Sequence, residues 1–400
     1  MRNSITIFLF ISTGVFAQVD SFPYFSNHTN DITNIIFSPD DKYILTSSWD
    51  ETIVIHRNDS TCDTVQVLRD FKGAVNTMAF SRDGYKLIAG GQDGILNMYT
   101  FSDSFFILAN IDAQLLLNNA QIEKLIYGPG MRIIFSAGSD GRFIIYDLVK
   151  EKPMILKGNR PICAAAVAID RMSYFIANDG NPLIQQFDIF GKLLNTFEGH
   201  SNDITDLLVT VDRKYLISSS KDKTIKIWDI ANAKVAHTFT DHTWSVTDID
   251  MDPFGLYLVS GSLDGTVHLY DLKARTTLNS YALTGFKVNA VALSPSNTTI
   301  AAAAQPTGVK NPAGFFTIPT GLKPRKVVLP KIMDLEPLIA KEQAKEQAKE
   351  QAKKDKQAKK ESKEKPKSTK ETNTKPDKQA NKESVLEISE QVKITIKDNE

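Results

Sequence analysis

The sequence predicts an all-β fold that repeats one unit of short antiparallel strands. Between Glu198 and Ile230, apolar and polar residues alternate in three segments separated by turn residues, Ile204 to Val209, Tyr215 to Ser220 and Thr224 to Trp228. Alternation with a period of two is typical of strands with one buried face. The Asp of the tight turn before the third segment recurs at separations of 43, 47, 39, 43 and 42 residues, as Asp50, Asp93, Asp140, Asp179, Asp222 and Asp264.

The unit also has a defined start and end. It opens on Gly199-His200 and closes on Trp228-Asp229, and an aromatic residue recurs six positions after the Asp as Tyr99, Tyr146, Trp228 and Tyr270. A Gly-His opening, a Trp-Asp ending and a repeat of about 40 to 45 residues are the signature of the WD-repeat β-propeller family. This unit closely resembles that family, and the resemblance implies four-stranded antiparallel blades arranged in a ring.

One polar set recurs in three of the copies, with a His 22 residues before the marker Asp and a hydroxyl between them. Its members are His28, Thr46 and Asp50; His200, Ser218 and Asp222, with Trp228; and His242, Ser260 and Asp264. In the family that the chain resembles, such residues form a buried hydrogen-bonded chain within a blade. A Ser, His and Asp together are also typical of hydrolases, but a set repeated once per blade favours a scaffold role.

The two ends of the repeat region are complementary. Ser21 to Ser26 has the composition of a strand but no preceding blade, whereas the last copy supplies only three strands, Val288 to Leu293, Thr299 to Ala304 and Gly314 to Ile318. We expect the N-terminal strand to complete the last blade, because closure removes exposed sheet edges. The prediction is a seven-bladed β-propeller over residues 18–322.

The first seventeen residues resemble a secretory signal peptide. Met1 to Ala17 has one Arg, an apolar run and small residues before Gln18, where we expect cleavage. The apolar run is shorter than a membrane span, so we expect no stable membrane insertion after cleavage, with an uncleaved anchor as the alternative. The predicted location is secreted or periplasmic. Cys62 and Cys163 fall on different blades, so we expect two free thiols.

The repeat pattern stops near Pro319. Residues 323–340 are expected to form an extended linker punctuated by Pro, and residues 341–400 a tail rich in Lys, Glu, Gln and Ala. Within this tail, EQAK repeats favour a helix and the following polar stretch favours disorder. Near the end, Val392, Ile394 and Ile396 alternate with polar residues, which is typical of a strand added to a partner's sheet edge or of a frayed end.

The composition and motifs argue against several function classes. Because 47 basic residues balance 47 acidic ones, no global field attracts nucleic acid. No phosphate loop, zinc motif or Cys cluster is present, so we expect no cofactor and no metal. Asp248, Asp250 and Asp252 alternate as in a calcium loop, but Pro253 and Val259 occupy the positions where such a loop needs Gly and Glu. We interpret this stretch as the innermost strand of the sixth blade.

These features favour a non-enzymatic platform that binds a protein or peptide; a secreted propeller hydrolase and an envelope anchor with the tail as spacer are the alternatives. In the family that the chain resembles, the His loops and Asp turns lie on the narrower face. Exposed aromatic residues there are typical of binding hot spots. The candidate partner-binding residues are Trp49, Trp244, Phe286, Lys287, Arg160 and Lys221. The alternative is that each Trp packs over its own blade. The oligomeric state stays open.

Overall fold

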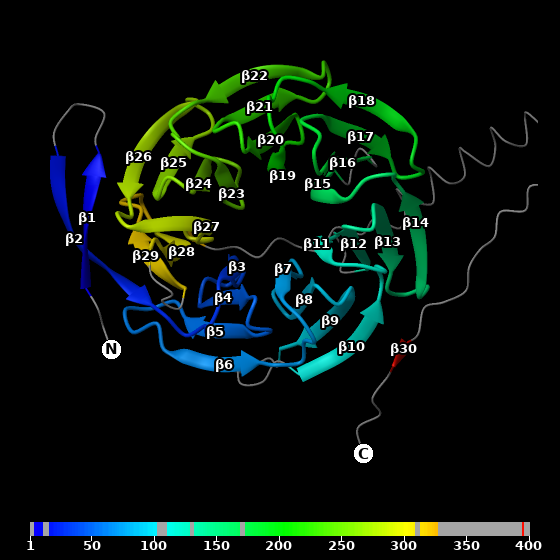
Figure 1. The fold of residues 1–400 in the computed structure, drawn as a ribbon, viewed down its shortest axis with the longest axis horizontal. Coiled ribbons are helices and arrows are strands. Elements are labelled where there is room, and N and C mark those ends of the chain that lie inside the picture. The colour runs from blue at the N-terminus through cyan, green and yellow to red at the C-terminus, as the bar shows by residue number, and fades with distance from the viewer. Residues whose placement is uncertain are drawn as a thin grey trace, which may run out of the picture. The chain divides into compact units, whose positions relative to one another are not determined.

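The computed structural model describes residues 4–10, 16–101, 110–128, 132–168, 173–308, 313–326 and 394–395. Within these residues, antiparallel strands form seven four-stranded blades around a central axis (Figure 1). The prediction of a seven-bladed β-propeller is confirmed. In blades 1 to 6 the first strand in sequence lies nearest the axis and the fourth lies at the rim, whereas in blade 7 the N-terminal strand takes the rim position (Figure 1).

The blades follow one another along the chain. Blade 1 comprises β3 (Ile32–Phe37), β4 (Tyr43–Ser48), β5 (Ile53–Arg57) and β6 (Thr64–Leu68). Blade 2 comprises β7 (Val75–Phe80), β8 (Lys86–Gly91), β9 (Ile95–Thr100) and β10 (Asn110–Leu116). Blade 3 comprises β11 (Ile122–Tyr127), β12 (Ile133–Gly138), β13 (Arg142–Asp147) and β14 (Lys152–Lys157). Blade 4 comprises β15 (Ile162–Ala168), β16 (Ser173–Asn178), β17 (Ile184–Asp188) and β18 (Leu193–Phe197). Blade 5 comprises β19 (Ile204–Val209), β20 (Tyr215–Ser220), β21 (Ile225–Asp229) and β22 (Lys234–Phe239). Blade 6 comprises β23 (Val246–Met251), β24 (Tyr257–Ser262), β25 (Thr266–Asp271) and β26 (Thr276–Ala282). Blade 7 comprises β27 (Phe286–Leu293), β28 (Thr299–Pro306) and β29 (Gly314–Pro319), and β2 (Phe16–Phe25) completes it.

The hydrophobic core lies between neighbouring blades. One cluster, for example, joins Ile53 and Leu68 of blade 1 to Val75 and Leu87 of blade 2, and all four side chains are buried. Because each sheet is covered on both faces by its neighbours, the strands of the second position are almost entirely buried, as in β4. This packing makes the ring a rigid support for the loops at its two ends.

The ring is closed by the N-terminal strand, as predicted. β2 pairs with β29 through Tyr24 opposite Phe316 and Phe25 opposite Phe315. The ring centroids of Tyr24 and Phe316 lie 4.9 Å apart, and Phe22 is only 5% exposed within the core of the last two blades. Backbone pairing and apolar burial therefore both hold the closing strand.

Two short segments near the chain ends add strands outside the blades. The backbone of β1 (Ser4–Phe10), within the segment predicted to be a signal peptide, pairs with β2 and with β26. β30 (Ile394–Thr395) pairs with β10 at the rim of blade 2, so the C-terminal alternation contacts this chain's own sheet edge. The tail from residue 327 to 393 lies outside the described residues. Both cysteines are free, as expected.

In the described part of the chain, no helix has the length and hydropathy that a membrane crossing requires.

Candidate functional site

The propeller has two faces that differ in their side chains. We call one the His–Asp face: it carries the loops before the innermost strands and the turns after the second strands. Trp49 in such a turn donates its backbone N–H to the carbonyl of Asp31 in such a loop, 3.0 Å away. We call the other the opposite face; it carries the turns between the first and second strands, such as the turn that follows Ser38.

A buried hydrogen-bonded chain crosses blade 5 beneath the His–Asp face. His200 Nδ1 lies 2.7 Å from Asp222 Oδ2, and His200 Nε2 lies 2.7 Å from Ser218 Oγ. Trp228 donates from Nε1 to the same hydroxyl at 2.8 Å. Ser218 and Trp228 are fully buried. The chain ties the loop before the innermost strand to the second and third strands of its blade.

Blades 1 and 6 repeat this arrangement with another last member. In blade 1, His28 bonds Asp50 and Thr46, and His56 stands where blade 5 has Trp228, with Nε2 3.4 Å from Thr46 Oγ1. In blade 6, His242 Nε2 lies 2.7 Å from Ser260 Oγ, whose partner is the hydroxyl of Tyr270. His242 bonds Asp264 at 3.3 Å. The three sets found in the sequence thus form three buried chains.

These chains keep their carboxylates ionised. Burial alone would raise the pKa of Asp222, but hydrogen bonds from His200 and Thr224 hold that pKa well below its usual range. Asp50 and Asp264 have lowered pKa values for the same reasons. Burial lowers the pKa of His268 to about 3, and its electrostatic interaction with the neighbouring His242 acts in the same direction. In all three blades, hydrogen bonds from the His and Thr side chains thus stabilise the ionised Asp.

Blade 3 contains a fourth chain, which the recurring His–Asp pattern of the sequence does not predict. Asn118 replaces the His: its Nδ2 donates to Asp140 Oδ1 at 3.1 Å, and Ser136 Oγ donates to its Oδ1 at 2.6 Å. The separation of Asn118 and Asp140 is again 22 residues. That spacing was the signal that could have revealed it.

A second repeated contact, a side-chain hydrogen bond to a backbone carbonyl, joins neighbouring blades. Each innermost strand has a β-bulge, at its second residue in blades 1 to 6 and at its fourth in β27, and the bulged side chain reaches the next innermost strand in several blades. Thr247 donates to the carbonyl of Val288 at 2.9 Å, and the Cys163 thiol donates to the carbonyl of Ile204 at 3.3 Å. Thr33 makes the same contact with Val75. Cys163 therefore serves as an inter-blade donor.

The candidate partner-binding residues do not all behave alike. Trp49 and Trp244 are 57% and 50% exposed on the His–Asp face. Lys287 Nζ lies 5.5 Å from the centre of the Trp244 ring, so blades 6 and 7 present these two side chains together. Phe286 differs from the expectation of an exposed aromatic: it is half-buried, with its ring 5.3 Å from Tyr24 and 5.1 Å from Phe316.

The two remaining candidates lie farther round the ring. Arg160 is exposed and donates from Nη1 to the carbonyl of Gly180 at 3.4 Å. Lys221 forms an ion pair with Asp203 at 3.0 Å. The charge of Lys221 is thus neutralised by an Asp of its own blade. Arg160 and Lys221 are therefore not part of the cluster formed by Trp244 and Lys287.

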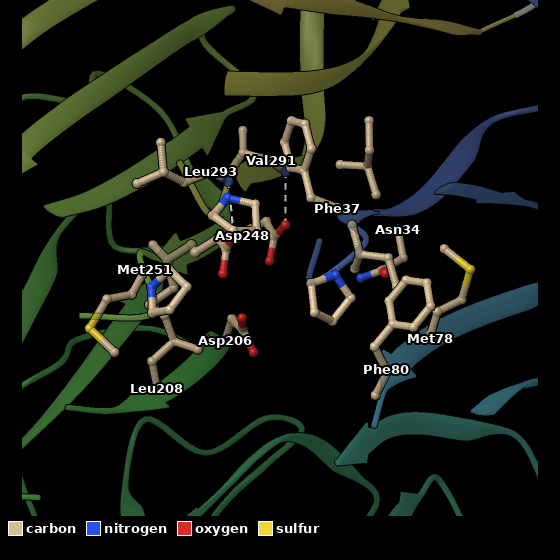
Figure 2. Close-up of a pocket in the computed structure, with 18 of the residues that line it drawn as sticks. Asn34, Phe37, Met78, Phe80, Asp206, Leu208, Asp248, Met251, Val291 and Leu293 are labelled. Carbon is tan, nitrogen blue, oxygen red and sulfur yellow. Dashed lines mark hydrogen bonds between the residues drawn. The ribbon is translucent and has the colours of Figure 1, made fainter. Parts of the chain in front are cut away.

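The centre of the ring carries a further set that the sequence analysis missed. The residue immediately after the bulge occupies the same place in all seven innermost strands: Asn34, Thr77, Lys124, Ala164, Asp206, Asp248 and Ala290. Five of these residues line one cavity of about 600 Å³. We call these seven residues the channel ring. It combines acidic, basic and amide side chains, of which Figure 2 labels Asn34, Asp206 and Asp248.

No group of three or more His, Cys, Asp or Glu side chains suited to a metal ion is found among the described residues. Asp248 and Asp250, which imitate a calcium loop in the sequence, instead accept backbone N–H groups of Val291 and Leu293, each at 2.8 Å. The innermost strand predicted there is β23.

Comparisons with known proteins agree with this architecture. The family model "WD domain, G-beta repeat" matches residues 20–57, 62–100, 191–229 and 233–271. The first match begins in β2, as expected if this strand plays the part of an outermost strand before a repeat. Each matched segment contains residues of one outermost strand and then the three inner strands of the next blade, here blades 1, 2, 5 and 6.

Several curated proteins are similar over part of the chain. "Nuclear distribution protein nudF" of Emericella nidulans is 24% identical over 52% of this chain and 41% of its own length. "Periodic tryptophan protein 2 homolog" of Dictyostelium discoideum is 25% identical over 39% of this chain and 17% of its own length. "Target of rapamycin complex subunit wat1" of Schizosaccharomyces pombe is 42% identical over 14% of this chain and 19% of its own length. The chain thus spans less than half the length of these relatives. The matched repeats, the seven blades and the buried His–Asp chains together support a WD-repeat β-propeller.

Proposed function

We propose that this protein is an exported, non-enzymatic platform that binds a protein or peptide on its His–Asp face. The observation that carries the proposal is the exposure of Trp49 and Trp244 at 57% and 50% on that face. Large aromatic side chains left in water are unfavourable unless a partner covers them, and Trp is enriched at binding hot spots. The segments that carry Trp49 and Trp244 are supported by the packed blades beneath them, so their position does not depend on a bound partner.

The surroundings of Trp244 suit a binding hot spot. Lys287 lies over its ring at 5.5 Å, and half of the Trp244 side chain stays exposed. Phe286, next to Lys287 at the start of β27, packs against Tyr24 and Phe316 and so supports the backbone that carries Lys287. We therefore assign Trp49, Trp244 and Lys287 to contact with the partner and Phe286 to the support of the loop.

A hydrolase function of the repeated Ser, His and Asp sets is disfavoured by their geometry. Ser218 Oγ is fully buried and already bonds both His200 and Trp228. A nucleophile must reach its substrate, and this hydroxyl is enclosed by its own blade. The relatives' names point the same way, since one of them is a complex subunit.

Export rests on the N-terminal segment, whose short apolar run and small residues before Gln18 are typical of a cleaved signal. The tail would then act as a spacer outside the cytoplasm. An envelope anchor remains the alternative to a free secreted platform. The N-terminal residue of the protein isolated from its native source tests cleavage directly.

The test of the binding face is affinity capture from the native source with the full chain. Trp49→Ala and Trp244→Ala should each lose the captured partner at nearly unchanged thermal stability, whereas the matched control Phe190→Ala, an aromatic that is 39% exposed elsewhere, should keep it. Phe286→Ala should lower stability as well as capture. Unchanged capture by the Trp49→Ala and Trp244→Ala double variant contradicts the proposed face.

A further inference from the structure

A second candidate binding site lies in the central channel, on the face away from the exposed tryptophans. Its cavity of about 600 Å³ is within the range of small-ligand pockets. The lining residues come from the ends of the innermost strands and from the turns that follow them, including Pro39, Arg82, Phe254 and Pro295. Those turns belong to the opposite face. The cavity therefore opens where none of the partner-binding candidates lie.

The floor of this cavity is acidic. Lys124 Nζ lies 2.6 Å from Asp206 Oδ1, which pairs one ammonium with one carboxylate. Asp248 and Asp250 add two carboxylates that have only backbone N–H partners on their Oδ2 atoms. Figure 2 shows Asp206 and Asp248 facing the same open space. Three carboxyl groups share one ammonium on this floor, so acidic groups outnumber basic ones.

The floor also has an excess of hydrogen-bond acceptors. Asn34 Oδ1 is shielded from solvent and receives no hydrogen bond among the described residues. Because this oxygen is shielded from a ligand as well as from water, binding depends on the carboxyl groups. Burial raises the pKa of Asp248 well above its usual range and the charge of Asp206 raises it further, so a cationic ligand would favour the ionised form of Asp248.

The walls above the floor are apolar. Phe37, Met78, Phe80, Leu208 and Met251 line the cavity from blades 1, 2, 5 and 6. Figure 2 shows Met78 and Phe80 on one side of the space and Leu208 and Met251 on the other. Such walls accept an aliphatic stem and two flexible Met side chains adapt to its shape.

We propose that this channel binds an arginine side chain presented by a peptide segment of a partner. The guanidinium would donate to the carboxyl groups of Asp248 and Asp250, whose Oδ2 atoms accept the backbone N–H groups of Val291 and Leu293, while its stem packs between the apolar walls. Arginine fits better than lysine because its planar group carries five donors and is less strongly hydrated. An anionic ligand would meet three carboxylates.

The mouth of the channel carries the opposite charge. Arg82 lines it, and the Arg325 guanidinium lies 5.2 Å from the Phe254 ring. Arg325 also donates its backbone N–H to the carbonyl of Ser296, which fixes this segment at the mouth. We infer that a carboxylate next to the bound arginine, as in an Arg-Glu sequence, would meet these two arginines.

The test uses the full chain and a fluorescently labelled hexapeptide, Gly-Ala-Arg-Glu-Ala-Gly, with fluorescence anisotropy as the readout. Its twin with citrulline in place of arginine keeps the shape but loses the charge. We expect the arginine peptide to bind at least about tenfold more tightly than the citrulline twin, as for a charge-assisted hydrogen bond. Equal binding, or no saturable binding of the arginine peptide, overturns the proposal.

Two variants with opposite expected effects separate binding from folding. Asp250→Asn keeps an oxygen for the Leu293 N–H and should weaken arginine binding several-fold. Lys124→Met removes the competing ammonium and should strengthen it, a result that partial unfolding cannot imitate. Weaker binding by Lys124→Met overturns the proposal.

Matched controls should leave the affinity unchanged. Asp203→Asn removes a carboxylate on the His–Asp face, and Trp49→Ala removes one of the exposed tryptophans. If Trp49→Ala weakens the peptide as strongly as Asp250→Asn does, the peptide binds the His–Asp face and the channel proposal is wrong.

Discussion

Lys124 in blade 3 and Asp206 in blade 5 form an ion pair of 2.6 Å with blade 4 between them in the ring. The equivalent residue of blade 4 is Ala164, which is too short to intervene. The contact thus links two blades that are not neighbours. Lys124 keeps 25% of its side chain exposed and Asp206 only 5%. Burial would lower the pKa of Lys124, but the charges of Asp206 and Asp248 raise it overall, so the ammonium stays protonated.

Breaking this pair should destabilise the ring. Asp206→Asn leaves an ammonium near the axis without its nearest countercharge. The expected loss in the free energy of unfolding is about 2 kcal/mol, below the roughly 3–5 kcal/mol of a fully buried pair because Lys124 is partly hydrated. Chemical denaturation measures this change. The double variant Lys124→Met with Asp206→Leu should recover most of the loss, and a double variant as unstable as the single one would contradict an ion-pair origin.

The buried chain of blade 5 gives a second prediction. Trp228→Phe removes the indole N–H that donates to Ser218 but keeps an aromatic ring in the core. We expect a loss of about 1–2 kcal/mol in the free energy of unfolding, because the hydroxyl loses a buried partner. Tyr270→Phe in blade 6 is the matched comparison. Its hydroxyl contact with Ser260 is longer, 3.3 Å against 2.8 Å, so its loss should be smaller. A loss for Tyr270→Phe as large as that for Trp228→Phe would show that the length of this hydrogen bond does not decide the loss.

The buried chains show what the sequence could predict. The constant spacing of His200 and Asp222 and of its counterparts is visible without a structure, and their bonds form as the family resemblance implied. Asn118 has the same spacing but another side chain, so a search for His alone overlooked it. The propeller fold could be predicted from the repeat and from the last copy, which supplies only three strands, because both features are visible along the sequence.

The channel ring could not be predicted in the same way. Lys124 and Asp206 are 82 residues apart, and no local pattern connects them. The bulge in each innermost strand also breaks the alternation that would assign a side chain to a face. Phe286 was misplaced for a related reason, since its burial depends on Tyr24 from the other end of the chain.

Asp250 should make stability depend on pH. Burial raises its pKa to about 6 in the folded protein, against about 3.9 in the unfolded chain. Between these values the folded state holds a proton that the unfolded state has lost. The contribution of Asp250 is therefore fully present below about pH 4 and is lost as the pH rises through about 6.

Asp250→Asn removes that dependence. We expect the variant to gain stability relative to the parent chain as the pH rises from about 4 to about 7, as measured by urea denaturation across this range. Asp203→Asn, which removes a carboxylate paired with Lys221 on the His–Asp face, should show no such gain. A stability difference between Asp250→Asn and the parent that stays constant with pH would mean that Asp250 is ionised throughout.

The opposite dependence should appear at lower pH. Asp50, Asp222 and Asp264 have lowered pKa values in the folded state, so their contribution is present above about pH 4 and is lost as the pH falls toward the folded values. Asp222→Asn should reduce the loss of stability between about pH 4 and pH 2, measured by thermal unfolding. An acid transition of unchanged steepness would assign it to other groups.

Two nested truncations test ring closure and separate it from the role of the leader segment. A chain that starts at Gln18 lacks β1 but keeps Phe22, Tyr24 and Phe25, so β2 still pairs with β29. We expect its unfolding midpoint to stay close to that of the full chain. A chain that starts at His28 lacks the closing strand as well, which exposes the edge of β29 and the apolar surface that Phe22 and Tyr24 cover. Its midpoint should fall sharply, because unpaired strand edges and uncovered core side chains are both unfavourable. Equal midpoints for the two truncated chains would show that β2 does not close the ring, whereas a fall already at the first truncation would assign a structural role to β1.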